Sequence, residues 1–256
     1  MDNRLTFLGH STVLVDLDGV RVLTDPLFGY LAGGAIRRHA PDVSPGSLPE
    51  VSAVVISHGH LDHLDLASLR VLTGAPVLIV PVGLGRGVAR VARGVVHEMR
   101  PGDRLKVGAL TLEAVHAEHG RRRSPFTASE GALGILIAGS TTVYFAGDTD
   151  LFPAMRELAG RVDVSLLPVG GWGPTLGRGH LDPVRAAEAA ERIQPAIAIP
   201  IHWGALFPVG LRRLARRRFD GPGEAFREAL AARGSRVAVR ILQPGQSMAL
   251  DAGPGR

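Results

Sequence analysis

Short apolar runs, each bounded by glycine, proline or small polar residues, recur along the whole chain. Runs of about four to eight apolar residues with such borders are typical of strands buried in a sheet. The pair Asp18-Gly19 separates two of these runs and forms a favourable two-residue hairpin turn. The pattern predicts strands at residues 5–8, 13–17, 20–24, 51–56, 77–80, 105–107, 110–115, 133–137, 142–145, 164–167, 196–201, 237–242 and 247–250.

Helices are predicted in three places. The clearest runs from Pro183 to Ile193, because Asp182 is a good N-cap and proline fits the first helical position. The other two cover residues 65–72 and 224–233, and a glycine follows the last one. Residues 29–49 are rich in glycine, proline and small side chains, which predicts a long surface loop. Periodicity alone therefore indicates a mixed α/β fold.

The composition narrows the class of protein. The chain has 256 residues, which suits one large α/β domain, and we expect residues 1–256 to form a single domain. It has no cysteine, which excludes disulfides and thiolate ligands and leaves nitrogen and oxygen donors for a metal. No apolar run is long enough to span a bilayer, and residues 1–7 do not have the pattern of a signal peptide. A cytoplasmic protein is expected.

The formal net charge is +5, and arginines are concentrated at residues 121–123 and 212–218. A basic balance can favour an anionic partner. However, Lys106 is the only lysine, and the many arginine, alanine, glycine and proline residues are typical of a GC-rich genome. We therefore interpret segment 212–218 as a solvated basic face and expect no stable nucleic-acid partner.

The segment from Ser57 to His63 carries three histidines and an aspartate directly after the predicted strand 51–56. Imidazole and carboxylate groups are the ligands that zinc and similar divalent metals take. Side chains two residues apart in an extended segment point the same way, so His58 and His60 can share one metal. Asp62 and His63 then project elsewhere, towards a second metal. The cluster thus predicts a metal site at a strand end.

This cluster resembles the H-x-H-x-D-H signature of the metallo-β-lactamase fold superfamily. Five further segments follow the order and the approximate spacing of that superfamily's metal-binding segments. They are Leu8-Gly9-His10-Ser11, Thr24-Asp25-Pro26, His116-Ala117-Glu118-His119, Ala146-Gly147-Asp148-Thr149 and Ile201-His202-Trp203-Gly204. The resemblance covers most of the chain and implies an αββα four-layer sandwich with a site along one edge.

The resemblance also implies a set of metal ligands. One metal would be held by His58, His60 and His119, the second by Asp62, His63 and His202, and Asp148 would bridge them. Two divalent ions are expected, zinc first, with manganese or iron also compatible. Two such ions can share a hydroxide that is a nucleophile at neutral pH, and Asp62 would orient it.

Some positions near the ligands leave alternatives. Both His116 and His119 follow the predicted strand 110–115, and related sequences favour His119 as the ligand. His116 would then lie beside the ligands or contact the substrate. His10 and Asp25 are expected to support the ligands from behind, because metal-bound histidines donate their other N–H to a carboxylate or carbonyl. For His10, a capping role in the turn after the first strand is an equal alternative.

Local motifs indicate the substrate class. The segments 8–15, 23–28, 179–183 and 201–204 resemble the N-acylphosphatidylethanolamine-hydrolysing phospholipase D branch, and equally the ascorbate-6-phosphate lactonase relatives. Gly120 stands where the phospholipase branch has an aromatic residue, and Asp150 replaces a glycine, so this chain departs from the pattern at two positions.

The resulting expectation is hydrolysis of a phosphodiester in a small-molecule or lipid-like anionic substrate. Arg121 or His180 would hold a phosphate oxygen, and His180 is also a candidate catalytic residue. Trp172, in the glycine-rich segment 168–179, would contact the substrate from a gating loop. The alternatives are a lactonase or other carbonyl ester hydrolase and, from another class, a nucleic-acid-processing or nucleic-acid-binding protein. A homo-oligomer is compatible with the sequence.

Overall fold

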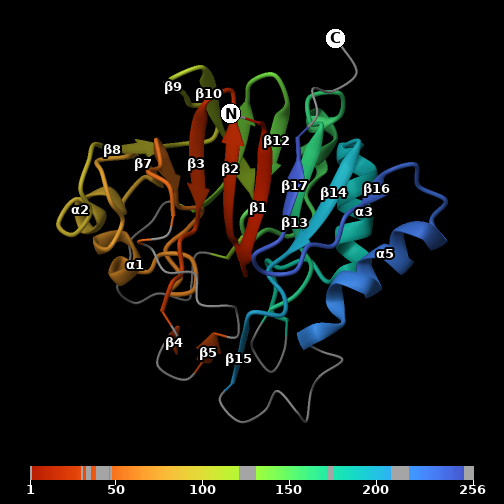
Figure 1. The fold of residues 1–256 in the computed structure, drawn as a ribbon. Coiled ribbons are helices and arrows are strands. Elements are labelled where there is room, and N and C mark those ends of the chain that lie inside the picture. Colours follow the sequence, from red (N-terminus) through yellow and green to blue (C-terminus); the bar gives the residue numbers. More distant parts are fainter. Residues whose placement is uncertain are drawn as a thin grey trace.

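The computed structural model describes residues 2–29, 31–32, 36–38, 46, 48–120, 131–171, 176–208 and 219–250. Two seven-stranded sheets pack face to face (Figure 1). The first sheet has the order β17 (Ser247–Ala249), β1 (Arg4–Gly9), β2 (Thr12–Leu17), β3 (Val20–Thr24), β6 (Ala53–Val55), β7 (Val77–Pro81) and β8 (Val96–Met99). The second has the order β16 (Ala238–Val239), β14 (Ile197–Ile201), β13 (Val164–Pro168), β12 (Thr142–Phe145), β11 (Ala132–Ala138), β10 (Leu110–Ala117) and β9 (Arg104–Val107).

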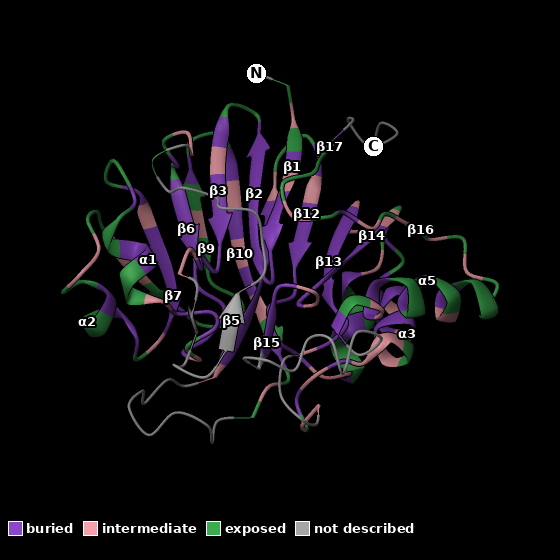
Figure 2. Ribbon diagram, turned by 60° about the horizontal axis from the view of Figure 1, so that its bottom comes forward, coloured by how far each residue is buried: buried purple, intermediate pink, exposed green. Residues whose placement is uncertain are grey.

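Helices cover the outer face of each sheet. The helices α1 (Leu66–Arg70) and α2 (Gly85–Val88) contribute Leu69 and Val88 to an apolar cluster on the first sheet. The second sheet is covered by η2 (Pro153–Leu158), α3 (Pro183–Ile193) and α5 (Pro222–Ala232). Figure 2 shows that the strands between these layers are largely buried, whereas the helices expose one side. The four-layer αββα sandwich is confirmed.

The core between the sheets follows from the alternation of side chains along the strands. Phe7 and Val15 of the first sheet and Ile135 and Phe145 of the second belong to one buried cluster. The side chains that alternate with these along each strand point to the opposite face of the sheet and pack against the helices, as Tyr144 and Leu136 do. Because both faces of each sheet are covered, strands such as β6, β7, β11 and β14 are apolar throughout.

Strand direction determines where the site lies. The strands β1, β3, β6, β7 and β8 of the first sheet run in one direction, as shown by the parallel and antiparallel pairings that connect them. In the second sheet, β10, β12, β13 and β14 likewise share a direction. Their carboxyl ends therefore meet at one edge in each sheet, where ligand sites of such sheets usually form.

Most predicted elements are confirmed, and α3 has the predicted bounds, with the Asp182 side chain accepting a hydrogen bond from the Arg185 backbone. The strands β8, β4 (Leu31–Ala32), β5 (Ile36–Arg38) and β15 (Leu206–Pro208) were not predicted, nor were α2 and η2. The segment 29–49, predicted as a long surface loop, contains the strands β4 and β5, and β5 pairs with β4 and with β15 in a small third sheet. The strand predicted at 237–242 is reduced to the two residues of β16.

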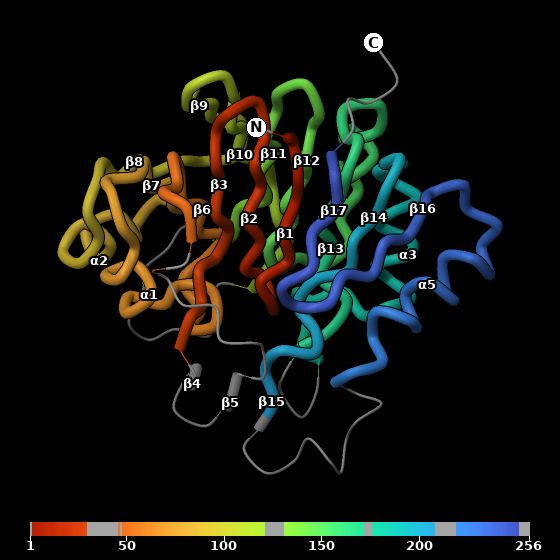
Figure 3. Tube along the Cα trace, in the orientation of Figure 1, coloured from red at the N-terminus to blue at the C-terminus, as the bar shows by residue number. Residues whose placement is uncertain are grey.

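The chain trace in Figure 3 shows how the first and second halves of the chain are arranged in the two sheets. The early part of the chain builds the first sheet and the later part the second, but the late strand β17 returns to lie beside β1. The pairing joins Arg4 to Ala249 and Thr6 to Ser247. Strands from the two ends of the described chain thus share one sheet.

Candidate metal centre

Loops at one edge of the sandwich bring eight histidine and aspartate side chains together. They leave the carboxyl ends of β1, β6, β10, β12 and β14. The potential ligand atoms form two groups, and within each group all lie within 4.8 Å of one another: His58, His60, His119 and Asp148, and then His10, Asp62, His63 and His202. The seven side chains predicted as metal ligands are all among these eight.

In the first group, His60 lies between two other imidazoles. Its Nδ1 is 2.9 Å from His58 Nε2 and 3.2 Å from His119 Nε2. Asp148 Oδ2 is 3.9 Å from His58 Nε2. Three ring nitrogens and a carboxylate oxygen thus converge, which is a ligand set that divalent metals take.

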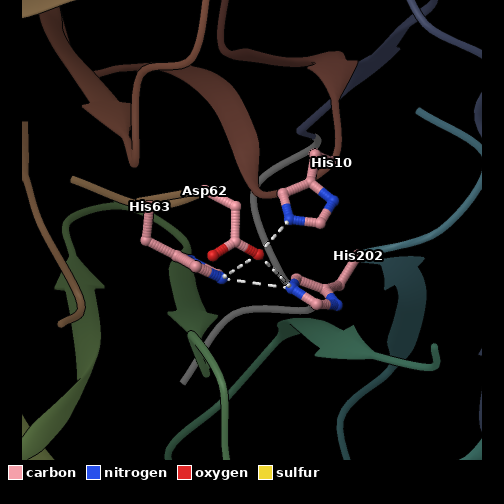
Figure 4. Close-up of side chains that lie close together, drawn as sticks. All are labelled: His10, Asp62, His63 and His202. Carbon is pink, nitrogen blue, oxygen red and sulfur yellow. Dashed lines mark hydrogen bonds and ion pairs between the residues drawn. The ribbon is translucent and has the colours of Figure 1, made fainter. Parts of the chain in front are cut away.

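In the second group, Asp62 Oδ2 is surrounded by imidazole nitrogens (Figure 4). It is 3.1 Å from His10 Nε2 and 3.5 Å from Nε2 of both His63 and His202. Those two last nitrogens are 3.1 Å apart. Asp148 also reaches this group, with 3.2 Å from Oδ1 to His202 Nε2 and 3.4 Å from Oδ2 to His63 Nε2. Asp148 therefore contacts both groups, as a bridging ligand would.

Hydrogen bonds on the far side of the rings determine which nitrogen carries the proton. His119 Nδ1 donates to the Gly179 carbonyl at 2.6 Å, and His202 Nδ1 donates to the Gly170 carbonyl at 2.8 Å. A carbonyl oxygen can only accept, so the proton of each neutral ring is on Nδ1. The lone pair of Nε2 then points into the cluster, which is the state in which histidine binds a metal.

Asp25 and Ser57 orient two further rings in the same way. Asp25 Oδ2 is 2.6 Å from His63 Nδ1, and the same carboxylate accepts the Ser57 hydroxyl at 2.6 Å and the Ser57 backbone N–H at 2.7 Å. Because the Ser57 hydroxyl donates to Asp25, its oxygen is left to accept from His58 Nδ1 at 3.0 Å. Both rings therefore also direct Nε2 towards the cluster.

Neighbouring lone pairs at such distances repel each other unless a cation lies between them or one ring takes up a proton. The donors are nitrogen and oxygen atoms, they are mostly buried, and their outer sides are held by oxygen acceptors. These features fit divalent metal ions such as zinc, manganese or iron.

The protonation states of the histidines and aspartates in the metal-free cluster also suit divalent metal ions. Burial lowers the pKa of His58 well below its ordinary value and that of His60 to about 4, so both rings are neutral at pH 7. Burial alone would raise the pKa of Asp148, but the charge of His202 and other neighbours outweighs it and holds this pKa well below its usual range. Burial would likewise lower the pKa of His63, yet the surrounding carboxylates, Asp148 foremost, raise it well above its ordinary value. A proton on His63 thus supplies the positive charge that the carboxylates require.

The backbone is also unusual at the cluster. His10, Asp25 and His202 have positive φ angles of 56°, 33° and 63°. Non-glycine residues adopt this region rarely, and at functional sites the surrounding structure holds them there. Here the His202 backbone N–H donates to the His10 carbonyl at 2.9 Å, and the Thr12 hydroxyl donates to the Asp25 carbonyl at 2.8 Å. The strained residues are therefore fixed by contacts with one another and with strand β2.

The structure separates the two candidates for the third histidine ligand. Strand β10 continues to Ala117, two residues beyond its predicted end, so His116 is still part of the strand. Its side chain is 51% exposed and lies 3.3 Å from Glu118 Oε2, whereas His119 lies past the strand and joins the cluster. His116 Nε2 lies beside Glu118 Oε2, and its ring packs edge-on against the ring of Phe152. Its place beside the ligands or at the substrate stays a prediction.

His10 contacts Asp62 and Asp25 contacts His63, and His10 also belongs to one of the two metal-compatible groups. His180 lies at the cluster, with Nε2 3.3 Å from Asp148 Oδ2 and Nδ1 donating to the Gly177 carbonyl at 3.2 Å. Arg121 and Trp172, the other predicted substrate contacts, lie outside the described residues, as does segment 212–218.

Sequence reasoning missed three groups that orient the rings. Ser57 could have been found, because it directly precedes His58 at the strand end. The carbonyls of Gly170 and Gly179 carry no side-chain signal, so their role emerges only from the folded backbone.

The family assignment rests on the sequence. Residues 20–203 match the family described as the beta-lactamase superfamily domain, and the chain belongs to that superfamily. With its cluster of histidines and aspartates, it is a metal-dependent hydrolase of this superfamily.

Individual relatives add detail. A UPF0173 metal-dependent hydrolase of Methanopyrus kandleri is 33% identical over 256 residues, which cover 95% of this chain and 98% of the relative. The N-acyl-phosphatidylethanolamine-hydrolyzing phospholipase D 1 of Caenorhabditis elegans is 30% identical over 230 residues, which cover 80% of this chain and 64% of the relative. Among solved structures, the metallo hydrolase Igni18 of Ignicoccus hospitalis has a TM-score of 0.72 at 20% identity and covers 98% of this chain and 99% of its own. The last likeness concerns the fold. Among the helices that the structure describes, none has the length and apolar character needed to cross a bilayer.

Proposed function

We propose that the protein hydrolyses phosphodiesters with two divalent metal ions, zinc being the first candidate. His58, His60 and His119 would hold one ion, Asp62, His63 and His202 the other, and Asp148 both. The observation that carries the proposal is the convergence of four Nε2 atoms, whose directions are fixed by Asp25, Ser57 and two backbone carbonyls. Metal ions in such a site make water acidic enough to supply a nucleophile at neutral pH and neutralise charge on phosphoryl oxygens.

Asp62 is suited to orient the attacking water. Burial would raise the pKa of its carboxyl, but the charge of His63 and hydrogen bonds from three histidines hold this pKa well below its ordinary value. The carboxylate is therefore ionised and can only accept hydrogen bonds. His10 contacts its Oδ2 at 3.1 Å, which limits rotation of the carboxylate.

His180 is suited to contact the phosphate group. Its side chain is 13% exposed, and its Nδ1 donates to the Gly177 carbonyl. Burial would lower the pKa of His180, but the hydrogen bond to Asp148 and the charge of that carboxylate raise it above its ordinary value. The protonated ring has a second N–H at Nε2, on the Asp148 side of the cluster, which would donate a hydrogen bond to a phosphate oxygen. Arg121 and Trp172 remain predicted substrate contacts, on the sequence alone.

The relation to a phospholipase D supports a phosphodiester over a carbonyl ester, because that relative's name specifies a phospholipid substrate and the identity is 30%. The same cluster could also act on a lactone, since metal ions polarise carbonyl oxygens as they do phosphoryl oxygens. The two chemistries therefore have to be separated by experiment.

The test is hydrolysis of bis(4-nitrophenyl) phosphate by protein loaded with zinc or manganese, with the bound metal quantified. Wild-type protein should turn the substrate over. Asp62→Asn should lose at least about 100-fold in kcat, because a neutral amide would replace a charged ligand of the second ion and the group that orients the water. Asp2→Asn, an exposed position, is the matched control and should retain full activity.

Absence of turnover by protein with both metals bound would contradict the phosphodiester proposal. Turnover of γ-lactones or 4-nitrophenyl acetate that Asp62→Asn loses would then make the protein a carbonyl ester hydrolase with the same cluster.

A further inference from the structure

A pocket of about 280 Å³ adjoins the metal cluster on the side of His119. It lies where β7, β8 and β10 end, at the same edge of the sandwich as the cluster, and β11 begins beside it. His119 belongs to both places: it lines the pocket, and its Nε2 is 3.2 Å from His60 Nδ1. A molecule held at the cluster can therefore extend into the pocket along the sheet edge.

The walls of the pocket are apolar. Pro81 and Val82 follow β7, Met99 ends β8, and Leu133 belongs to β11. Met99 and Leu133 are buried members of the core between the sheets, which gives the pocket a fixed floor. Small residues leave the space open, among them Gly131, where an added Cβ would meet nothing within 4 Å.

Polar groups lie among the lining residues beside these walls. Arg100, His116 and Glu118 line the pocket, and His116 and Glu118 are exposed and contact each other at 3.3 Å. An apolar interior with a few polar groups is the usual composition of a small-molecule subsite. This placement also accounts for His116, which the metal cluster does not use.

We propose that this pocket binds the apolar substituent of the substrate, a short alkyl chain or a single aromatic ring, while the cluster holds the charged centre. The inference rests on the proposed function in placing the charged centre at the metals. The size of the substituent follows from the volume of the pocket and does not depend on the reaction. An apolar cavity of about 150 Å³ accommodates benzene, so this pocket of about 280 Å³ holds one ring or a short chain and no long lipid tail.

The test is calorimetric binding of methyl-, butyl- and hexylphosphonate to metal-loaded protein, which needs no turnover. Each methylene that enters an apolar pocket should tighten binding about fourfold. We expect the affinity to rise steeply from the methyl to the butyl compound, and by less per methylene once the pocket is filled.

Two substitutions at the half-buried Val82 test the location. Val82→Trp fills the pocket and Val82→Asp places a charge in its wall, so either change should remove most of the dependence on chain length while methylphosphonate still binds. The matched controls are Val95→Trp and Val95→Asp, at a position that is 62% exposed and outside the pocket lining. They should leave the chain-length dependence unchanged.

Equal affinities across the series, or no binding by any member, would overturn the proposal, as would a chain-length dependence that both Val82 variants retain. Failure of phosphodiester hydrolysis is a separate result. A protein that does not cleave bis(4-nitrophenyl) phosphate but shows the chain-length dependence has the apolar subsite and a different reaction.

Discussion

The orientation of single imidazole rings decides what this protein can bind. His119 and His202 donate Nδ1–H to backbone carbonyls, and His63 faces the Asp25 carboxylate. Each of these contacts lies on the side of the ring away from the cluster. The rings are therefore oriented before a metal arrives, and metal binding requires little rearrangement.

The distinction between His119 and His116 gives a prediction at this scale. His119→Ala should reduce metal content and lower kcat/KM by at least about 100-fold, because a ligand of the cluster is lost. His116→Ala should leave the metal content unchanged, because its side chain is 51% exposed and outside the cluster. Metal analysis of the two purified variants, with kinetics, checks this. Equal metal loss in both variants would mean that the third ligand is misassigned.

Spacing along the chain predicts that His58 and His60 lie together, because neighbours two residues apart share a side of the backbone, and His60 Nδ1 is 2.9 Å from His58 Nε2. It was not sufficient for His10, whose contact with Asp62 joins residues 52 positions apart. Nor could it place His116, because the side to which residue 116 points is fixed only if the strand continues past residue 115, as it does to Ala117. Residue roles at the ends of strands thus depend on register, which the sequence pattern leaves open.

At the scale of elements, helix α3 links the site to the outer layer. It begins after His180, and the Asp182 side chain caps it by accepting the Arg185 N–H at 2.8 Å. Its alanines pack on the second sheet in a fully buried row. The position of His180 therefore depends on how firmly the first turn of α3 is held.

The cap gives the second prediction. Asp182→Ala should lower the free energy of unfolding by about 1 kcal/mol, because a backbone N–H of the first turn loses its acceptor. Asp182→Asn retains an acceptor for this N–H and should lower the free energy of unfolding by only about 0.3 kcal/mol. Urea unfolding of the two variants beside wild type checks this. A loss in the asparagine variant as large as in the alanine variant would show that the charge, and not the cap, is what matters.

Strong local signals explain why α3 was predicted to the residue, and their absence explains what was missed. Helix α2 contains Gly85 and Gly87, which are poor helix formers, and it is held by the Glu98 side chain that accepts from the Gly83 and Gly85 N–H groups. Strand β8 lies at the edge of its sheet and carries polar side chains, so it lacks an apolar run. Both elements depend on tertiary contacts that local patterns do not show.

The molecule as a whole places its cluster between two sheets, so protonation of the cluster acts on global stability. Without metal, burial lowers the pKa of His10 to about 3 and that of His60 to about 4, against an ordinary value near 6.5. A lowered pKa means that the unfolded chain binds more protons between these values. Stability from these groups is therefore lost as the pH falls from about 7 towards 4.

This loss of stability at lower pH can be measured in the metal-free protein. Metal-free protein, prepared with a chelator, should have a lower Tm at pH 5 than at pH 7.5. His63 and His180 have raised pKa values and act in the opposite direction. They are outnumbered by the histidines with lowered pKa values, because His58 and His119 join His10 and His60. Scanning calorimetry measures the difference. In metal-free His60→Asn the decrease in Tm should be smaller, and a decrease as large as in wild type would contradict the assignment.

The sandwich itself was not evident from periodicity, which gave only mixed α/β content. The pairing of β17 with β1 joins Arg4 and Ala249 across nearly the whole chain, and no local pattern encodes such a contact. The resemblance of the motifs to a known superfamily supplied the architecture instead. Local sequence patterns thus say least about which strands, far apart in the chain, pair with each other.

The pairing of β1 with β17 has a practical consequence for attaching other molecules to this protein. Strand β1 runs from Arg4 to Gly9 and delivers His10 to the cluster, so Arg4 and its partner Ala249 lie about 20 Å away, at the far end of the strand. A label or a surface linker attached at Arg4 or Ala249 would therefore lie away from the edge that carries the cluster. The Leu250 backbone N–H also donates to the Asn3 carbonyl at 2.9 Å, so a short peptide could join these two residues, and a circularly permuted chain could be opened in another loop while the cluster stays intact.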